Sequence, residues 1–260
     1  MKVLILDSTE AAIARAARIV ADQVASKPDA VLGLATGGTM LPLYGELRRI
    51  HAQGGLSFAR VRSFNLDEYV GLAADHPTSY HHYMREHLFD HIDIDLANTH
   101  LPRGDAADPA QEAEAYERRI DAAGGIDLQL LGIGRNGHIG FNEPTSSLNS
   151  ATRIKTLTAS TREANRPYFA TGETMPKYAL TMGIGSILAA RSCLLLATGA
   201  AKAEAVAQAV EGAVSAACPA SALQFHRHAT LVLDAEAASG LKLVEYYHHV
   251  HPGGAKSEFE

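Results

Sequence analysis

A short glycine-rich segment, Gly132–Pro144 (GIGRNGHIGFNEP), carries the densest group of side chains that could do chemistry. Asn136, His138 and Glu143 fall within eight residues of it, among glycines that allow unusual backbone angles. Imidazole changes its charge near neutral pH, and a carboxylate five positions away could orient or charge it, so the segment predicts a proton shuttle. A single histidine is more often structural, but one braced by glycines at the end of a predicted strand favours catalysis.

A second source of acid–base chemistry is the adjacent pair Asp67 and Glu68 in SFNLDEYVGL. Neighbouring side chains in an extended segment point to opposite sides, so only one of the two can face a given pocket. An ordinary Asp, with a pKa of about 3.9, is a weak base at neutral pH, and burial would have to raise that value before it could take a proton from carbon. The alternative for either residue is a structural cap on a helix or loop.

A phosphate site is indicated where a predicted strand runs into Thr36, Gly37, Gly38 and Thr39 before a helix. Glycines let successive backbone N–H groups turn toward one point, and a helix start adds partial positive charge. Lys202, after another strand, is placed to add a point charge. The pattern is neither a dinucleotide-binding nor a Walker motif, so a plain tight turn remains the alternative.

The elements that would position these residues alternate short apolar runs with longer amphipathic ones. Apolar residues recur at helical spacing from Ala12 to Val24, after a capping residue at Ser8 or Thr9. The predicted strands, apolar almost throughout, are Lys2–Leu6, Ala30–Thr36, Val61–Leu66, Asp127–Gly134, Ala179–Met182, Ser192–Thr198 and Ala229–Asp234. This order predicts an α/β fold with a doubly wound, mostly parallel sheet covered by helices on both faces. Its ligand crevice would lie beyond the carboxyl ends of the strands.

Composition and length limit the class of protein. The chain has 260 residues, no Pro/Ser-rich linker and no repeat, so we expect one domain over residues 1–252 and a disordered tail over 253–260. With 29 acidic and 23 basic residues, the charge argues against nucleic acid or an anionic membrane as a partner. The first apolar run is too short for a signal peptide and no run could span a bilayer, which predicts a cytoplasmic protein.

No metal site is predicted. Cys193 and Cys218 cannot make a disulfide framework and fit no Cys-rich zinc pattern. The histidines of YYHHVHP (His248, His249 and His251) lack a carboxylate at suitable spacing.

Taken together, these segments resemble the glucosamine-6-phosphate deaminase family, within the wider sugar-phosphate isomerase and 6-phosphogluconolactonase-like fold. The resemblance runs from about Lys2 to Tyr247. It is carried by LGLATGGT, SFNLDEYVGL with HPTSY, GIGRNGHIGFNEP with SSL, RIKTLT, TMGIGSIL, and VEGAVS with PASALQ. The FNEP continuation is specific to the deaminases and is missing from the lactonases.

The resemblance implies a small-molecule sugar phosphate as substrate and no cofactor: glucosamine 6-phosphate and water become fructose 6-phosphate and ammonia. Asp67 would move a proton from C2 to C1 of the substrate. His138, supported by Glu143 and Asn136, would open the pyranose ring. The Thr36–Thr39 loop and Lys202 would hold the phosphate.

The chain departs from its relatives at three positions. Asn136 stands where some relatives have Asp, and an amide can orient His138 but adds no charge. Met40 stands where Pro is common, a change that the helix start should tolerate. Pro167 stands where many relatives have a phosphate-contacting Arg; either Arg166 reaches the phosphate through a shifted loop, or Lys202 and the backbone suffice.

Some bacterial members of the family are activated by N-acetylglucosamine 6-phosphate at a subunit interface. The chain keeps the residue types of that site, at Ser146, Ser147, Arg153, Lys155 and Thr156. Its last segment, LVEYYHHVHP, does not align with the allosteric members, so regulation and assembly into a homo-oligomer are left open.

Three alternatives remain at this point. A galactosamine-6-phosphate deaminase would differ only in its contacts with one hydroxyl of the substrate. A 6-phosphogluconolactonase would need no base at C2, so Asp67 and the FNEP segment argue against it. A non-catalytic sensor of sugar phosphates would keep the phosphate loop and lose the acid–base groups, which are present here.

Overall fold

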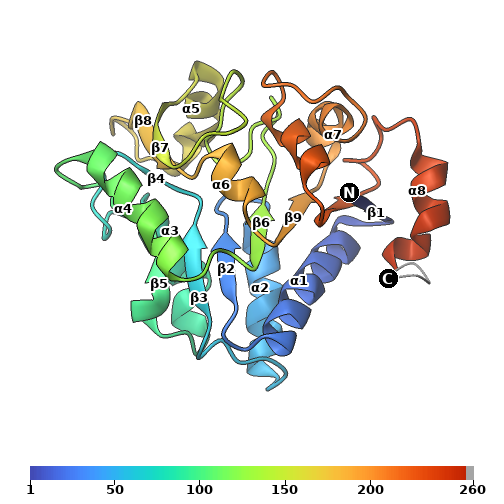
Figure 1. Cartoon of the computed structure of the whole chain (residues 1–260), viewed down its shortest axis with the longest axis horizontal. Coiled ribbons are helices and arrows are strands. Elements are labelled where there is room, and N and C mark those ends of the chain that lie inside the picture. Colours follow the sequence, from blue (N-terminus) through green and yellow to red (C-terminus); the bar gives the residue numbers. More distant parts are fainter. Residues whose placement is uncertain (256–260) are drawn as a thin grey trace.

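A seven-stranded parallel β-sheet forms the centre of the computed structural model, which describes residues 1–255 (Figure 1). The strand order is β1-β10-β9-β6-β2-β3-β5, and all these neighbours pair in parallel. The strands are β1 (Lys2–Leu6), β2 (Val31–Leu34), β3 (Arg62–Asn65), β5 (Thr99–His100), β6 (Leu128–Leu131), β9 (Ser192–Ala197) and β10 (Ala229–Asp234). The predicted doubly wound α/β fold is confirmed.

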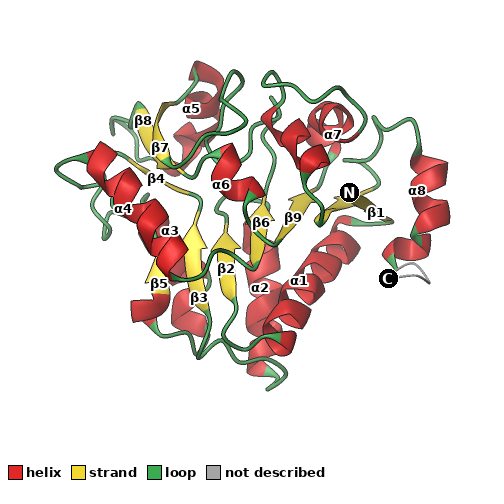
Figure 2. Cartoon of the chain, in the orientation of Figure 1, coloured by secondary structure: helices red, strands yellow, loops and turns green. Residues whose placement is uncertain are grey.

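Helices cover both faces of this sheet (Figure 2). They are α1 (Thr9–Ser26), α2 (Met40–Ala52), α3 (Tyr80–His87), α4 (Pro109–Ala122), α5 (Ala159–Asn165), α6 (Ile184–Leu188), α7 (Ala203–Val210) and α8 (Val244–Val250). Helix α1 illustrates how the sequence specifies them. The Ser8 hydroxyl caps it by accepting the N–H of Ala11 at 3.1 Å, and its buried face includes Ala12, Val20 and Val24, at the predicted helical spacing.

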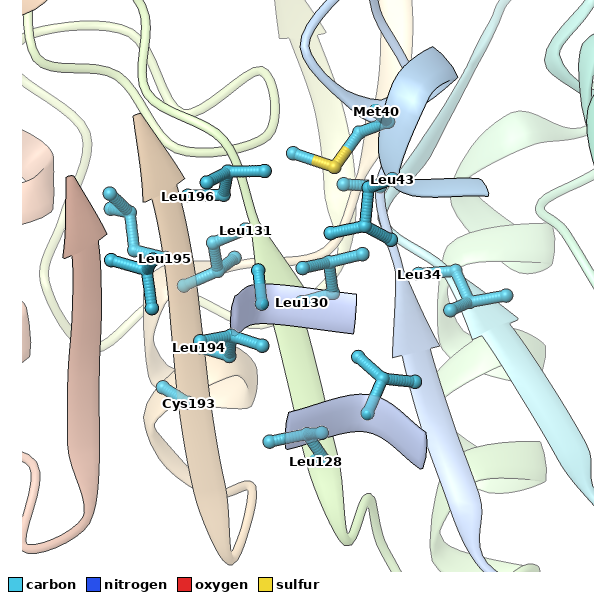
Figure 3. Close-up of a cluster of buried hydrophobic side chains, with 14 of the residues drawn as sticks. Leu34, Met40, Leu43, Leu128, Leu130, Leu131, Cys193, Leu194, Leu195 and Leu196 are labelled. Atoms are coloured by element: carbon cyan, nitrogen blue, oxygen red, sulfur yellow. The ribbon is translucent and has the colours of Figure 1, made fainter. Parts of the chain in front are cut away.

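The sheet core is built almost entirely from aliphatic side chains (Figure 3). Leu130 and Leu131 on β6 and Leu194 to Leu196 on β9 are all buried, which is expected when a parallel sheet is covered on both faces. Met40 and Leu43 from α2 are part of the same cluster. The first residues after the phosphate-loop candidate are therefore anchored in the core.

The chain changes winding direction between β2 and β6. From β2 it builds outward through β3 and β5, then returns to the other side of β2 with β6 and continues through β9 and β10. Ligands of doubly wound sheets bind at the carboxyl ends of the strands where this reversal occurs. The Thr36–Thr39 loop follows β2 and the glycine-rich segment follows β6, so both candidate segments reach this point.

A second, smaller antiparallel sheet lies over the carboxyl ends of the parallel strands (Figure 2). It consists of β4 (Asp67–Tyr69), β8 (Tyr178–Thr181) and β7 (Arg153–Thr156), in the order β4-β8-β7. Only β8 was expected from the sequence, and its place in an antiparallel sheet was not. Because β4 has three residues and β7 is half exposed, neither carries the continuous apolar run by which a buried strand is recognised.

The C-terminal segment packs beside the edge strand β1 (Figure 1). Residues Pro252–Gly254 form a 3₁₀ turn, and the Gly254 carbonyl accepts a hydrogen bond from Arg15 Nε at 3.0 Å. The predicted tail thus begins inside a packed turn, and residues 256–260 lie outside the described residues. Across residues 1–255, no helix has the length and apolarity needed to cross a membrane.

Packing between β2 and β6 yields a stability prediction. A Cβ on Gly33 would lie 2.0 Å from Oε1 of the buried Gln129 side chain, so Gly33→Ala should overpack this seam and cost roughly 1–3 kcal/mol. Gly45 on α2 is the matched control because a Cβ there has open space; Gly45→Ala should be neutral or stabilise by up to ~1 kcal/mol. Urea unfolding of the two variants measures the difference, and equal free energies of unfolding would contradict the seam packing.

Candidate active site

The turn after β6 presents His138 through a close contact with glycine. The Gly137 N–H donates to the Gly134 carbonyl at 3.0 Å, and the Gly134 N–H donates to the His138 carbonyl at 2.9 Å. A Cβ on Gly134 would lie 2.4 Å from the His138 ring. The ring can therefore lie across this turn only because position 134 has no side chain.

Glu143 faces His138 from the end of the same loop. Its Oε2 lies 3.5 Å from His138 Nδ1, and its carboxylate also accepts hydrogen bonds from Asn136 Nδ2 at 2.8 Å and Thr158 Oγ1 at 3.1 Å. Burial acts to raise the pKa of Glu143, but His138, Thr161 and Asn136 outweigh it and lower the pKa to about 2. Glu143 is therefore a fixed negative charge at neutral pH.

The arrangement leaves one imidazole nitrogen of His138 for chemistry. Nδ1 is buried 3.5 Å from Glu143 Oε2 and makes no hydrogen bond within residues 1–255, whereas Nε2 is not among the enclosed atoms. Asn136 supports the loop from both ends of its amide, donating to Glu143 and accepting the His138 N–H at 3.3 Å. The structure thus brings together Asn136, His138 and Glu143, as the sequence predicted.

Asp67 begins β4 and is 6% exposed. Its Oδ2 lies close to the glycine-rich loop, since a Cβ on Gly140 would be 3.3 Å from it. Burial first, and then the charge of Glu68, raises the pKa of Asp67 to about 8, against a lowering by the Phe141 N–H. Asp67 therefore has the raised pKa that a base acting on carbon needs.

Glu68 points the other way, as the extended backbone requires. Its buried carboxylate accepts the N–H groups of Tyr80 and His81, both at 3.1 Å, in the first turn of α3. An acidic group there also suits the helix dipole. Glu68 is therefore a structural cap of α3, the alternative that the sequence allowed. Asp67 lies against the His138 loop.

The Thr36–Thr39 loop has the backbone geometry of an anion site. Gly37 has φ of 109°, a conformation that favours glycine, and α2 begins at Met40. Within the described residues, the N–H groups of Gly37, Gly38 and Thr39 donate to no protein acceptor. Three consecutive free donors at a helix start are suited to a phosphate.

Lys202 approaches the same strand end as this loop. Its Nζ donates to the Ile133 carbonyl at 2.7 Å, and the adjacent Gly132 would place a Cβ 3.4 Å from Met40 Cε. Burial first, and then the charge of Arg135, lowers the pKa of Lys202. A lysine partly removed from water at this strand end favours an anionic ligand.

Arg166 is used within its own loop. Its guanidinium donates to the carbonyls of Glu173 at 2.9 Å and Ala170 at 3.3 Å. Tyr168, two residues later, does approach the phosphate-loop candidate: its hydroxyl would be 3.5 Å from a Cβ on Gly38. Sequence reasoning named Arg166 from a motif position and missed Tyr168.

The five residues proposed for regulation lie in two segments, Ser146 and Ser147 in the loop that precedes β7 and Arg153, Lys155 and Thr156 on β7 itself. Arg153 Nη1 donates to Asn142 Oδ1 at 2.8 Å, next to Glu143. Arg153 Nη2 and Ser146 Oγ are buried and have no hydrogen-bond partner within residues 1–255. Ser147 accepts the Asn149 N–H at 3.3 Å, and Lys155 and Thr156 continue along β7.

No group of three or more His, Cys, Asp or Glu side chains is arranged to hold a metal ion within residues 1–255. His251, from the C-terminal histidine cluster, is instead buried with Nδ1 3.1 Å from the Ala255 carbonyl.

The fold is that of a known class of sugar-phosphate enzymes. Residues 7–232 match the family described as glucosamine-6-phosphate isomerases/6-phosphogluconolactonase, and the chain belongs to that family.

Within it, the chain is similar to curated glucosamine-6-phosphate deaminases. The relative from Shewanella loihica is 57% identical over 96% of this chain and 93% of its own length, and that from Cellvibrio japonicus is 54% identical over 96% and 95%. A solved structure described as a monomeric glucosamine-6-phosphate deaminase has a TM-score of 0.90 and 50% identity, covering 92% of this chain and 100% of that chain. The 6-phosphogluconolactonase of Trypanosoma cruzi, with a TM-score of 0.75 and 20% identity over 93% and 97%, shares the fold.

The burial of Asp67 predicts a pH-dependent effect on stability. Its folded pKa is about 8 and its unfolded pKa about 3.9, so its contribution favours folding below pH ~4 and is lost as the pH rises toward 8. Asp67→Asn should therefore raise the free energy of unfolding by at least ~1 kcal/mol at pH 8 and by little at pH 4.5. Urea unfolding at both pH values measures this gain. The exposed Asp22→Asn is the control, and a gain that does not depend on pH would contradict the raised pKa.

Proposed function

We propose that this protein is a glucosamine-6-phosphate deaminase, which converts D-glucosamine 6-phosphate and water into D-fructose 6-phosphate and ammonia during amino-sugar breakdown. The observation that carries the proposal is the buried Asp67 carboxyl, with a pKa of about 8, against the loop that holds His138 and Glu143. The deaminase relatives, more than 50% identical over nearly the whole chain, support it.

Ring opening is the first step. His138 Nε2 would move a proton from O1 to O5 of the pyranose, giving the open-chain aldehyde. The ionised Glu143 would hold the ring by Nδ1 and stabilise the imidazolium form, as an orienting carboxylate does in other acid–base sites. Asn136 would keep Glu143 and the His138 backbone in place.

Proton transfer between carbons is the second step. Ionised Asp67 would remove the C2 proton, which the C2 ammonium and the aldehyde acidify, and return it to C1. The resulting ketimine adds water and releases ammonia. A base whose pKa lies close to the working pH combines a useful ionised fraction with basicity, and burial against Gly140 supplies that value here.

Binding of the phosphate would fix the substrate at the end away from the reacting carbons C1 and C2. The free N–H groups of the Thr36–Thr39 loop and the partly buried Lys202 are the groups we assign to it. Arg166, bound to its own loop, would reach the phosphate only after that loop moves, so we assign the main role to Lys202 and the backbone.

The alternatives are less well supported. A lactonase needs no base at C2, and nothing in its chemistry accounts for a buried carboxyl held near pKa 8. A galactosamine-6-phosphate deaminase would use the same acid–base groups, so side-by-side turnover of the two amino-sugar phosphates decides between the epimers. Cytoplasmic location stays a prediction. Assembly into a homo-oligomer, which the sequence left open, is decided by light scattering of this chain; the 50% identical solved relative is described as monomeric.

Asp67 yields the activity prediction. Wild-type protein should release ammonia and fructose 6-phosphate in equal amounts, and Asp67→Asn should lower kcat by ~10²–10⁴, the usual contribution of a proton-transfer group. Because the base must be ionised, kcat/KM should fall as the pH drops below about 8. A coupled assay from pH 6 to 9 measures both effects.

Asp22→Asn, which changes an exposed carboxylate on α1, is the control and should retain wild-type rates. Absence of products from wild-type protein would refute the deaminase assignment. Normal turnover by Asp67→Asn would leave the reaction assigned but remove Asp67 as its base.

We also propose that Ser146, Ser147, Arg153, Lys155 and Thr156 form a regulatory site for N-acetylglucosamine 6-phosphate. The orphaned Arg153 Nη2 and Ser146 Oγ support a polar ligand there, because buried polar groups normally have partners. The bond from Arg153 to Asn142 offers a route from this site to the catalytic Glu143.

If so, the effector should lower the KM for substrate about 5-fold or more, the lower range of allosteric coupling. Arg153→Gln should abolish the response, since it removes both the ligand contact and the bond to Asn142. Lys177→Gln, which removes an exposed cation beside the same sheet, should keep it. Identical substrate curves for wild-type protein with and without the effector would refute regulation at this site.

A further inference from the structure

One tyrosine outside the predicted machinery is bonded to the phosphate-loop candidate. Tyr83, on α3, donates its hydroxyl to the Gly37 carbonyl at 2.9 Å. That carbonyl also accepts the Met40 N–H at 2.9 Å, so it has two donors. Burial first, and then the neighbouring Tyr168, raises the pKa of Tyr83, so the hydroxyl keeps its proton to donate.

The direction of the Gly37 carbonyl decides where the next N–H points. The carbonyl of Gly37 and the N–H of Gly38 belong to one planar trans peptide and face opposite ways. A hydroxyl that holds the carbonyl on the α3 side therefore turns the Gly38 N–H away from α3. Gly37, with φ of 109° and no side chain, has many conformations to lose, so an added restraint on its peptide has a large effect on order.

Helix α3 connects this restraint to the carboxylate beside Asp67. Glu68 holds the first turn of α3 through the N–H groups of Tyr80 and His81, and Tyr83 follows one turn later. The ring of Tyr83 is kept in place by His87, with ring centroids 4.6 Å apart. Through this helix, the position of the loop is coupled to that of the strand that carries Asp67.

We propose that Tyr83 is a positioning residue for phosphate binding: its hydroxyl fixes the Gly37–Gly38 peptide so that the loop presents its free N–H groups to the substrate phosphate. This inference rests on the proposed function for the identity of the substrate, but the loop's affinity for an anion can be measured without turnover. Tyr83 itself touches no reacting atom.

The test is Tyr83→Phe, which removes the hydroxyl and keeps the ring contacts. The phosphate takes no part in the bond changes, so losing one neutral hydrogen bond that orders its site should raise the KM for glucosamine 6-phosphate about 3- to 10-fold with kcat nearly unchanged. The dissociation constant for inorganic phosphate, measured by calorimetry, should rise by a similar factor. Tyr246→Phe, which removes a hydroxyl from an exposed tyrosine on α8, should change neither value.

The outcomes separate this proposal from the function. A wild-type protein that binds phosphate but does not deaminate refutes the function, and weaker phosphate binding by Tyr83→Phe would still support the positioning role. Equal phosphate affinity in wild type and variant overturns the role of Tyr83. A fall in kcat at unchanged KM also overturns it, because the hydroxyl would then act on the chemical step. Thermal melting of the variant close to that of wild type excludes a general loss of folding as the cause.

Discussion

Parallel pairing of β2 with both β3 and β6 is the constraint on which the rest of the site depends. Carboxyl ends of parallel strands open on the same edge of a sheet, so the Thr36–Thr39 loop after β2, Asp67 just after β3 and the His138 loop after β6 all lie at that edge. The register between β2 and β6 is tightly constrained, because Gly33 on β2 lies directly against the Gln129 side chain on β6. A shift of one residue would turn each of these strands over.

The small antiparallel sheet helps to bury Asp67 at that edge. β4 pairs with β8 so that Asp67 lies opposite Thr181, and the buried side chains of Tyr69, Phe141 and Phe169 belong to one apolar cluster. A carboxyl in this position loses hydration, and without a cation beside it the protein tolerates it mainly in the protonated form. The carboxyl that we propose as the base is thus kept at some cost to stability, an arrangement common at active sites.

The sequence was sufficient for the parallel sheet and for the residues that meet at its edge, because continuous apolar strands and glycine-braced polar segments are local signals. It was insufficient for β4, β5 and β7, whose two to four residues are too short for periodicity to register. Thr158, Tyr83 and Tyr168 were missed for a related reason. Each belongs to a helix or turn that reaches the site only through tertiary packing, although Thr158 does stand where an N-cap of α5 would be expected. Arg166 shows the reverse case: motif position suggested a phosphate ligand, and local carbonyl groups bind its guanidinium instead.

Asp67 and Glu143 are two buried carboxyl groups whose different surroundings give them different pKa values. Both are almost fully buried, at 6% and 2% exposure, and burial raises the pKa of each. His138, Thr161 and Asn136 outweigh burial at Glu143 and hold its pKa near 2. At Asp67, burial and then the like charge of Glu68 raise the pKa to about 8. Titratable groups whose environments push their pKa values apart are the groups that divide acid–base work. Glu143 is therefore suited to remain a charge that orients His138, and Asp67 to gain and lose a proton in each turnover. An Asp in place of Asn136 would remove a donor from Glu143 and add a charge, so the amide at this position helps to keep the two carboxylates distinct.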